Sequence, residues 1–505
     1  MEKNKQGIDE DKLAEGQCNS QDTCATERRG ISEDWLSVWI GLFIFVLSLG
    51  VFVGTDLLGF GITAGIWTDL SKALKPVSKG YAGLGGIGSL LATYVFLLVV
   101  MSIGASVLRA NVKRFIASFT AVYFISYLCW IIGSWANVAV TTPPDMQKFG
   151  ISWSLKLTPE AGFIVALLAG LIVGNFFQGF AGAIKDAVRP ELYIKTAIVI
   201  LGGFLGVTAA EKLGLATAVM FRGLCAIVEA YLIYWALVYF IARKYFKFSR
   251  EWAAPLASGI SICGVSAAIA TGGAIKARPV IPIMVSSLVV IFAVVELLVL
   301  PFIAQNFLHQ EPMVAGAWMG LAVKTDGAAV ASGAVADSLI RAKTLAIDGV
   351  NYKEGWIMGA ATTVKVFIDV FIGIWAFILA VVWCSVIECK PGEKVRAGQI
   401  WDRFPKFVIG YVLTFLAILY IGVAHPELIK QTKEAMAEGN VFRGIFFTMT
   451  FFTIGVVSNF KKLWEEGIGK LAAVYLLCLF GFIIWIGLFI SWLFFHGVKP
   501  PIVTG

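Results

Sequence analysis

The chain has 505 residues, of which 58% are hydrophobic and only 15% carry a charged side chain. Soluble domains carry about 25% charged residues, so this chain has too little polar surface for a soluble fold of its length. Its net charge of +8 comes from basic residues spread over short loops, a pattern that membrane topology explains better than a nucleic-acid interface does. We therefore expect the lipid bilayer, and no nucleic acid, as a partner.

The chain begins with a polar segment and continues as a series of apolar runs. Residues 1–34 have mixed charge and lack the apolar core of a signal peptide, so we expect a disordered cytoplasmic tail. The apolar runs have about 20 residues or more, the length that crosses a bilayer. This pattern predicts an all-α, polytopic membrane protein. Thirteen transmembrane helices are expected, at 35–57, 84–108, 115–140, 159–177, 193–210, 217–242, 253–275, 280–304, 314–337, 355–387, 407–424, 441–460 and 470–496.

The Lys and Arg residues of the loops indicate how the chain is oriented. With the N-terminus inside, the inner segments hold 23 of these residues and the outer segments 15, which favours a cytoplasmic N-terminus and an outer C-terminus. Lys276 and Arg278 fall outside in this arrangement and fit it poorly. They would fit better if 253–275 were re-entrant, so that it enters and leaves the membrane on the same side. If 314–337 were re-entrant as well, every loop after it would stay on the side first assigned to it.

Two segments of the chain resemble each other. Residues 198–215 read IVILGGFLGVTAAEKLGL and residues 451–468 read FFTIGVVSNFKKLWEEGI, each with an apolar run, a Gly-Val pair and a Lys-Leu pair. Seven predicted helices separate their positions, so the two segments would run in opposite directions. Inverted-topology repeats of this kind are common in secondary transporters. The match is short, and chance is the alternative explanation.

The run 253–275 is rich in Gly, Ser and Ala, and Ser261, Cys263, Gly264 and Ser266 lie together near its middle. Glycine weakens a helix by about 1 kcal/mol relative to alanine, so this segment is a candidate break. A broken helix at membrane depth exposes backbone N–H groups that suit an anion. These four residues are therefore candidate substrate ligands. The alternative is a continuous helix whose small residues allow close packing.

The run 314–337 carries Lys324 and Asp326 in mid-span, followed by Gly327. Charges inside a span are costly and are functional candidates by default. Two residues that are two apart point to different sides of a continuous helix, so both could face one cavity only if the helix unwinds near Gly327. Lys324 is then a candidate anion ligand and Asp326 a candidate site for coupling to H⁺ or Na⁺. The alternative is an ion pair with neighbouring helices.

Two further runs contain ionisable residues. Lys365 and Asp369 in 355–387 are four apart on one helix face, where they either neutralise each other or serve as a second anion ligand and a second coupling carboxylate. Arg222 and Glu229 in 217–242 also share a face, but Arg222 lies near the end of the run and can reach the interface, which favours a structural role. Glu296 is a weaker candidate.

The sequence lacks the motifs of enzymes and metal sites. The eight Cys and three His residues have no zinc-type spacing, so we expect no metal and no cofactor. No Walker A sequence, zinc-protease helix or GxSxG motif occurs. A GxSx element at 259–262 lacks a His in the membrane interior that could act as its base. We expect that the protein is not an enzyme.

The segment Ser258-Gly-Ile-Ser-Ile-Cys-Gly-Val-Ser-Ala267, after a basic loop, resembles the signature of the YeiH-like putative sulfate exporter family. Four further segments resemble parts of that family in the same order, so the likeness covers roughly 160–480. These segments are Gly170–Asn175, Ile198–Gly206, Gly316–Gly320 and Ala361–Lys365. Asn175, at the end of a helix that is similar to the family's GN-ending helix, joins the candidate substrate residues.

The resemblance implies a secondary transporter of anions, with sulfate as the family's presumed substrate. It also implies a relationship to the bile-acid-symporter and Na⁺/H⁺-antiporter type of fold, with inverted repeats and broken crossing helices. The transporter core would then span 159–497, with extra helices at 35–158 and a short C-terminal tail at 498–505.

The chain departs from the family pattern near the expected site. Lys324 and Thr325 stand where family members usually have a His and an acidic residue, and Asp326 is shifted by one position. Ile368 and Asp369 occupy the region where an Arg usually follows the intramembrane Lys. These departures put the substrate in doubt.

Three interpretations therefore stand. The first is a secondary active transporter of a small anion, with export of sulfate, sulfite or an organic sulfonate as its more specific form and H⁺ or Na⁺ as coupling ion. The second is a cation/proton exchanger that uses Asp326 and Asp369, and the third is a membrane scaffold or sensor. The lysines at mid-membrane favour the first over the second, and the cost of polar spans favours transport over a scaffold. We expect the protein in the cell (inner) membrane, and a homodimer is compatible with the sequence.

Overall fold

The computed structural model of the protein describes residues 31–503 apart from 141–142, 156–158, 160, 212, 279, 384–400, 402–404 and 459–468. The described chain is almost entirely helical. Its one sheet is a short antiparallel pair, β1 (Ile62–Ala64) and β2 (Leu74–Pro76). Ten helices of the described chain are long and apolar enough to cross a membrane, which confirms the polytopic all-α class. Residues 1–30 of the expected disordered tail lie outside the described residues, and so do residues 459–468 of the proposed repeat.

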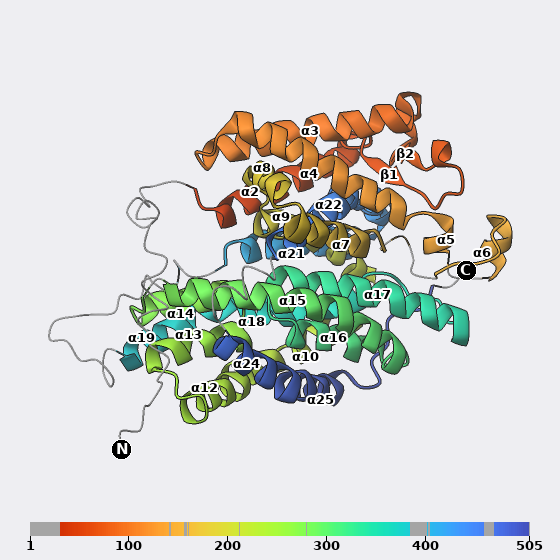
Figure 1. Ribbon diagram of the computed structural model, residues 1–505. Coiled ribbons are helices and arrows are strands. Elements are labelled where there is room, and N and C mark those ends of the chain that lie inside the picture. The colour runs from red at the N-terminus through yellow and green to blue at the C-terminus, as the bar shows by residue number, and fades with distance from the viewer. Residues whose placement is uncertain are drawn as a thin grey trace, which may run out of the picture.

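The helices form two bundles that lie one above the other in Figure 1. The upper group, here called the N-terminal bundle, also contains two helices from late in the chain. It consists of α2 (Glu33–Ser48), α3 (Gly85–Val107), α4 (Val112–Gly133), α7 (Ala161–Phe176), α9 (Pro190–Glu211), α21 (Phe407–Ala424) and α22 (Ile429–Val457). Short elements connect these spans: η1 (Leu49–Val53), η2 (Leu70–Lys72), η3 (Lys79–Leu84), α5 (Ala136–Ala139), α6 (Pro143–Lys148), α8 (Gln178–Ala183), η4 (Lys185–Ala187) and η7 (Pro426–Leu428).

Glycines allow the helices of the N-terminal bundle to pack backbone against backbone. A Cβ atom on Gly170 of α7 would lie 2.0 Å from the carbonyl oxygen of Phe452 in α22, and one on Gly455 would lie 2.4 Å from the carbonyl oxygen of Leu167. No larger residue fits at these positions. Small residues at helix contacts are typical of membrane proteins, which lack a hydrophobic driving force between their helices.

The lower group in Figure 1, here called the hairpin bundle, holds the remaining long elements. One span runs through α10 (Leu213–Gly223), α11 (Cys225–Val228), the π-helical segment η5 (Glu229–Tyr234) and α12 (Trp235–Lys244). The other elements are α13 (Arg250–Ser261), α14 (Ser266–Ala274), α15 (Val280–Phe307), α16 (Pro312–Ala322), α17 (Asp326–Asp348), α18 (Trp356–Val370), α19 (Ile372–Val382), α24 (Gly469–Cys478), the π-helical η8 (Leu479–Ile483) and α25 (Ile484–Phe495).

The predicted span 253–275 is a helical hairpin that does not cross the bundle. The hydroxyl of Thr271 in α14 donates a 2.7 Å hydrogen bond to the hydroxyl of Ser258 in α13. Residues 13 apart in one continuous helix would be about 20 Å apart, so α14 must fold back along α13. At the open end, the backbone N–H of Arg278 donates to the Glu251 carboxylate at 2.7 Å. We call α13 and α14 the first hairpin.

The predicted span 314–337 is a second hairpin, formed by α16 and α17. A Cβ atom on Gly320 of α16 would lie 2.6 Å from the carbonyl oxygen of Ala361, and one on Gly333 of α17 would lie 2.5 Å from the Cβ of Ala361. Both arms therefore lie against the same turn of α18. The expected broken crossing helices are thus replaced by two re-entrant hairpins, which explains why both runs are poorer in Leu than the true spans.

Ion pairs show which segments lie near each end of α9. At one end, Lys195 at the start of α9 bonds Asp34 at the start of α2 at 2.7 Å. At the other end, Glu211, which ends α9, pairs with Lys353 just before α18 and with Lys433 of α22. The backbone N–H of Lys353 in turn donates to the carbonyl oxygen of Pro501. The start of α2 and the C-terminal segment therefore lie at opposite ends.

Tracing the chain from these ends corrects one expectation. The α10–α12 span begins beside Glu211 and returns to the end where α2 starts, so the first hairpin opens at that end. Arg278 pairs with Glu251 there, and Lys276 is adjacent to it. Both basic residues therefore lie at the same end as the Arg243–Arg250 loop, and the expected location at the opposite end is wrong because the hairpin does not cross.

Candidate functional site

The tips of the two hairpins meet in the middle of the hairpin bundle. The first tip is the four-residue break 262–265 between α13 and α14, and the second is the break 323–325 between α16 and α17. The backbone N–H of Gly264 donates a 2.6 Å hydrogen bond to the carbonyl oxygen of Lys324. The interruption predicted near Cys263 and Gly264 is confirmed. The helix containing Lys324 also unwinds, and the hydroxyl of Thr325 then caps α17 by accepting from the N–H of Ala328 at 3.2 Å.

One charged group lies around these tips on the side of α18. The Lys365 ammonium donates to the carbonyl oxygen of Ile262 at 2.7 Å and lies 3.5 Å from Asp326 and 3.8 Å from Asp369. The thiol of Cys263 donates a 2.7 Å hydrogen bond to Asp326. We call these four residues the aspartate cluster; all are at most 2% exposed. The structure thus brings Asp326 of the second hairpin to Lys365 and Asp369, which share the run 355–387.

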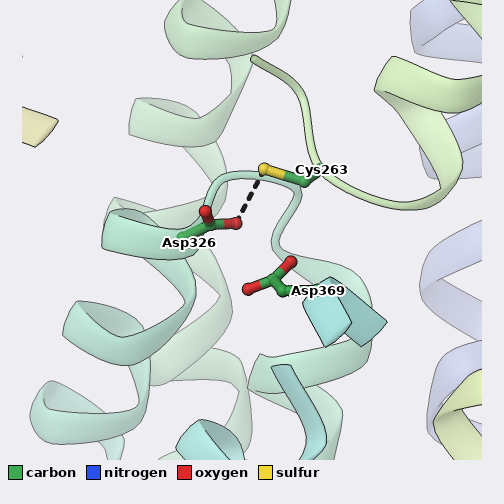
Figure 2. A group of neighbouring side chains, drawn as sticks. All are labelled: Cys263, Asp326 and Asp369. Carbon is green, nitrogen blue, oxygen red and sulfur yellow. Dashed lines mark hydrogen bonds between the residues drawn. The ribbon is translucent and has the colours of Figure 1, made fainter. Parts of the chain in front are cut away.

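Three members of the aspartate cluster could hold a cation. Figure 2 shows the Cys263 thiol and the carboxylates of Asp326 and Asp369 around one space, and their ligand atoms lie within 4.8 Å of one another. In the described chain, one oxygen of Asp326 and both oxygens of Asp369 have no hydrogen-bond partner. A divalent metal would meet the Lys365 ammonium here, so a proton or a monovalent cation suits the charge balance better. Spacing along the sequence could not show this group, because its members come from three separated segments.

A second charged group surrounds the side chain of Lys324, which points away from Asp326. The Lys324 ammonium contacts the carbonyl oxygen of Leu321 and lies 4.5 Å from the ring centroid of Tyr234. Its backbone N–H donates to Glu296 of α15 at 3.1 Å, and the Tyr475 hydroxyl donates to the same carboxylate at 3.0 Å. Lys324 and Asp326 therefore face different surroundings across the break.

Glu229 in the π-helical segment completes this second group, which we call the glutamate cluster: Glu229, Glu296 and Lys324. Its carboxylate is 1% exposed and interacts electrostatically with Lys324. Sequence reasoning gave both residues little weight, because Glu229 shared a face with Arg222, for which a structural role was favoured, and Glu296 stood alone on its run. The signal that could have found them is their depth within apolar runs, which makes a partner on another helix obligatory.

A small cavity of about 90 Å³ borders the tips on the side that faces the N-terminal bundle. Val265 and Thr325, the N-cap residues of α14 and α17, line it together with Gly327. Its other walls come from Pro190, Glu191, Ile194, Ala293, Ile454 and Val457. The N-termini of both returning arms therefore border the same space. Helix N-termini carry unpaired N–H groups and partial positive charge, which favour anions.

Of the remaining predicted site residues, Ser261 and Ser266 lie beside the first tip, whereas Asn175 lies in the other bundle. Ser261 ends α13, fully buried, and its hydroxyl has no hydrogen-bond partner among the described residues. Ser266 begins α14 and is partly buried. Asn175 ends α7 in the N-terminal bundle, where its amide donates to the carbonyl oxygens of Leu171 and Ser458 at 2.9 Å each. The structure therefore gives Asn175 a role in joining α7 to the end of α22, outside both clusters.

Comparison with known proteins identifies the family. The profile of the family described as Conserved hypothetical protein 698 matches residues 152–474, which include both hairpins and both charged clusters. This chain belongs to that family. The resemblance to the YeiH-like family is thereby confirmed. No solved structure matches the chain.

Three relatives show how the family varies in length. A UPF0324 membrane protein of Nitrosomonas europaea is 41% identical over 476 residues, which cover 94% of this chain and 97% of the relative. An uncharacterized protein of Archaeoglobus fulgidus is 55% identical over 165 residues, which cover 29% of this chain and 88% of the relative. A UPF0324 membrane protein of Streptococcus agalactiae is 26% identical over 336 residues, covering 66% of this chain and 91% of the relative. About a third of this chain thus has no counterpart in the streptococcal protein.

Proposed function

We propose that this protein is a secondary active transporter of a small anion in the cell (inner) membrane, coupled to H⁺ or Na⁺. The observation that carries the proposal is the meeting of two hairpin tips, Gly264 on Lys324, among buried charges in the middle of a membrane bundle. Irregular backbone at membrane depth is tolerated where it is buried in protein or lines a cavity. Discontinuous helices at the midplane are also where secondary transporters bind their substrates.

The cavity between the tips and the N-terminal bundle is the proposed anion site. The N-termini of α14 and α17 both border it through Val265 and Thr325, so their N–H groups can bind oxyanion oxygens. Ser261, Cys263, Gly264 and Ser266 belong to the break or to the helix ends beside it. Lys324 and Lys365 contribute positive charge to the tips from either side. The volume of about 90 Å³ limits the substrate to a small ion.

The aspartate cluster is the proposed coupling site. Lys365 can neutralise only one of the two carboxylates, Asp326 and Asp369, at a depth where an uncompensated charge costs about 3 kcal/mol or more. A proton or Na⁺ on the second carboxylate restores neutrality. Because Asp326 begins α17 and α17 also borders the anion cavity, binding of the cation and the anion would act on the same hairpin tip.

The likeness to putative sulfate exporters makes sulfate, sulfite or an organic sulfonate the first substrates to examine, with export as the direction. A cytoplasmic N-terminus is proposed from the distribution of basic residues. Moving Lys276 and Arg278 to the inner side changes the tally from 23 against 15 to 25 against 13. The re-entrant first hairpin therefore strengthens the bias that the sequence already had.

Flux of labelled sulfate and sulfite into proteoliposomes tests the proposal, with imposed pH and Na⁺ gradients in separate arms. We expect anion uptake that depends on one of the two gradients and is lost in Asp326→Asn. Glu251→Gln is a matched control, because Glu251 is an acidic residue of the first hairpin that pairs with Arg278 at the open end. Absence of flux for every anion and gradient would overturn transport and leave the scaffold or sensor interpretation.

One observation favours a second candidate, a cation/proton exchanger. Four buried carboxylates, Asp326, Asp369, Glu229 and Glu296, accompany only two buried lysines at the tips. An exchanger would dissipate a pH gradient when Na⁺ or K⁺ is added without any anion substrate. Such exchange, together with no anion flux, would replace the anion proposal.

A further inference from the structure

The glutamate cluster has one ammonium for two buried carboxylates, and Glu229 is the carboxylate without a hydrogen-bond donor in the described chain. Glu229 is 1% exposed, and neither of its oxygens has a hydrogen-bond partner in the described chain. The nearby titratable groups are Lys324 of the second tip and, on its own span, Tyr234 and Cys225. On the side of α25, the Glu229 side chain lies near Gly487: a Cβ atom added to Gly487 would lie 3.5 Å from Glu229 Oε1. Glu296 also interacts electrostatically with Lys324 and accepts a hydrogen bond from its backbone N–H, so one ammonium lies near two buried carboxylates.

The hydroxyl of Tyr234 explains why Glu229 has no donor. A Cβ on Gly487 would lie 2.7 Å from the Tyr234 hydroxyl and 3.5 Å from Glu229 Oε1, so the two oxygens border the same spot. The phenol, however, donates its proton to the carbonyl oxygen of Ile483 at 2.9 Å. A phenol oxygen can still accept a hydrogen bond. A protonated Glu229 could therefore donate to Tyr234, whereas an ionised Glu229 obtains no proton from it.

The local backbone provides an independent observation. Glu229 begins the π-helical segment η5, Tyr234 ends it, and Ile483, the acceptor of the Tyr234 phenol, ends the second π-helical segment, η8. Single π-helical turns are rare and are frequently found at functional sites. The π-helical segments η5 and η8 are thus joined through Tyr234, the residue that faces Glu229.

We propose that Glu229 is a proton-binding site, separate from the aspartate cluster. A hard metal cation such as Na⁺ needs several oxygen ligands, and the groups around Glu229 are an ammonium, a phenol and a thiol. A proton needs only one acceptor, which Tyr234 provides. The neutral carboxyl is the form that removes the cost of an unpartnered charge in the membrane interior.

The consequence for transport rests on the proposed function. The aspartate cluster and the glutamate cluster each hold one lysine and two carboxylates, so each becomes neutral when it binds one proton. The fully loaded protein would then carry about two protons, which match the charge of a divalent anion such as sulfate. Glu229 thereby supplies the second proton of an electroneutral cycle.

Infrared spectroscopy of the purified full-length protein tests the protonation directly. We expect a carbonyl-stretch band of a protonated carboxyl at neutral pH that is lost in Glu229→Gln and unchanged in the control Glu251→Gln. Tyr234→Phe should keep the band and shift its frequency, because the acceptor of the hydrogen bond is removed. If Glu229→Gln fails to fold, this frequency shift tests the site on its own. A band that is unaffected by both Glu229→Gln and Tyr234→Phe would overturn the site.

A flux experiment separates this site from the proposed function. The ratio of protons to sulfate, measured as the pH gradient that just balances a known sulfate gradient in proteoliposomes held at zero membrane potential, should fall from about two to about one in Glu229→Gln. If the infrared band is lost in Glu229→Gln but the parent protein shows no anion flux, Glu229 is still a proton-binding site and the transporter proposal is rejected. An unchanged ratio of about two in Glu229→Gln would overturn the role of Glu229 in the cycle.

Discussion

The ammonium of Lys365 lies 3.5 Å from the carboxylate of Asp326, and this ion pair joins α18 to the tip of the second hairpin. The same ammonium donates to the carbonyl oxygen of Ile262 in the first tip at 2.7 Å. Lys365 therefore holds both tips against one helix. Any motion that parts the tips must break at least one of these contacts, so Lys365 links the charge state of the aspartate cluster to the position of the hairpins.

Lys365→Met should strongly destabilise the protein, because it leaves Asp326 and Asp369 without their ammonium. Breaking a buried ion pair by removing one partner costs about 3–5 kcal/mol. The double variant Lys365→Met/Asp369→Asn removes one charge of each sign and should recover most of the thermal stability without recovering transport. Melting temperature in detergent and anion flux measure the two effects.

Arg222→Gln is the control for this pair, since Arg222 is partly exposed near the end of α10 and outside both clusters. It should leave melting temperature and flux close to those of the parent protein. If the double variant transports like the parent, Lys365 and Asp369 form only a structural pair, and the aspartate cluster is not the coupling site.

Gly264→Leu should abolish transport while the protein still inserts into the membrane. A Cβ at this position would lie 2.1 Å from Val289 Cγ1, so a larger side chain must push the first tip away from α15 and from Lys324. Overpacking of this kind costs about 1–3 kcal/mol, which a membrane-inserted bundle can tolerate. Expression in the membrane fraction and flux are the measurements, and Gly214→Leu, where nothing lies within 4 Å of the Cβ position, is the matched control.

Cysteine labelling should place Lys247 and Lys276 on the same side of the membrane and Lys499 on the other. All three are exposed, and the first hairpin returns to the end at which it starts. Single cysteines at these positions, treated with a membrane-impermeant thiol reagent in intact cells and in inverted vesicles, provide the readout. Labelling of positions 247 and 276 from opposite sides would mean that α13 and α14 cross the membrane.

The membrane spans could be predicted from the sequence, whereas the two hairpins could be raised only as an alternative to crossing helices. Length and apolarity are sufficient for a true span, and most true spans have a helical counterpart within a few residues. The largest exception is α22, which begins at Ile429, 12 residues before the predicted start at 441. A 23-residue run such as 253–275 has the length of a crossing helix, and only the contact between Ser258 and Thr271 reveals that it folds back. The misplaced charges of Lys276 and Arg278 and the small number of Leu residues in the run were the signs of this in the sequence.

The site was predictable where a charge interrupts an apolar run. Lys324, Asp326, Lys365 and Asp369 could be chosen on that ground alone, and the i, i+4 spacing of Lys365 and Asp369 already indicated that they pair. The contacts of Lys365 with Asp326 and Ile262 could not be predicted, because they depend on how both hairpins fold against α18. Glu229 and Glu296 were undervalued since their common partner is on another helix. Asn175 was chosen from the family resemblance; its amide bonds the carbonyl oxygens of Leu171 and Ser458, and an amide at a helix end commonly bonds nearby carbonyl groups.

Gly327→Ala should lower anion affinity without lowering stability. Gly327 is in the first turn of α17 and lines the proposed anion cavity, and an added Cβ would lie 3.2 Å from Ile194 on the opposite wall. The methyl group therefore takes up space beside the helix N-terminus. Replacing Gly by Ala inside a helix stabilises it by up to about 1 kcal/mol, so any loss of binding would not reflect unfolding.

Calorimetric titration of sulfate into the detergent-solubilised protein measures this affinity, and the melting temperature without anion is the stability control. Gly214→Ala makes the same chemical change in the first turn of α10, where the added methyl group meets nothing, and should bind like the parent. If Gly327→Ala binds sulfate as tightly as Gly214→Ala does, the anion does not occupy the space at the N-terminus of α17. The lysines at the tips would then have to bind it from another side.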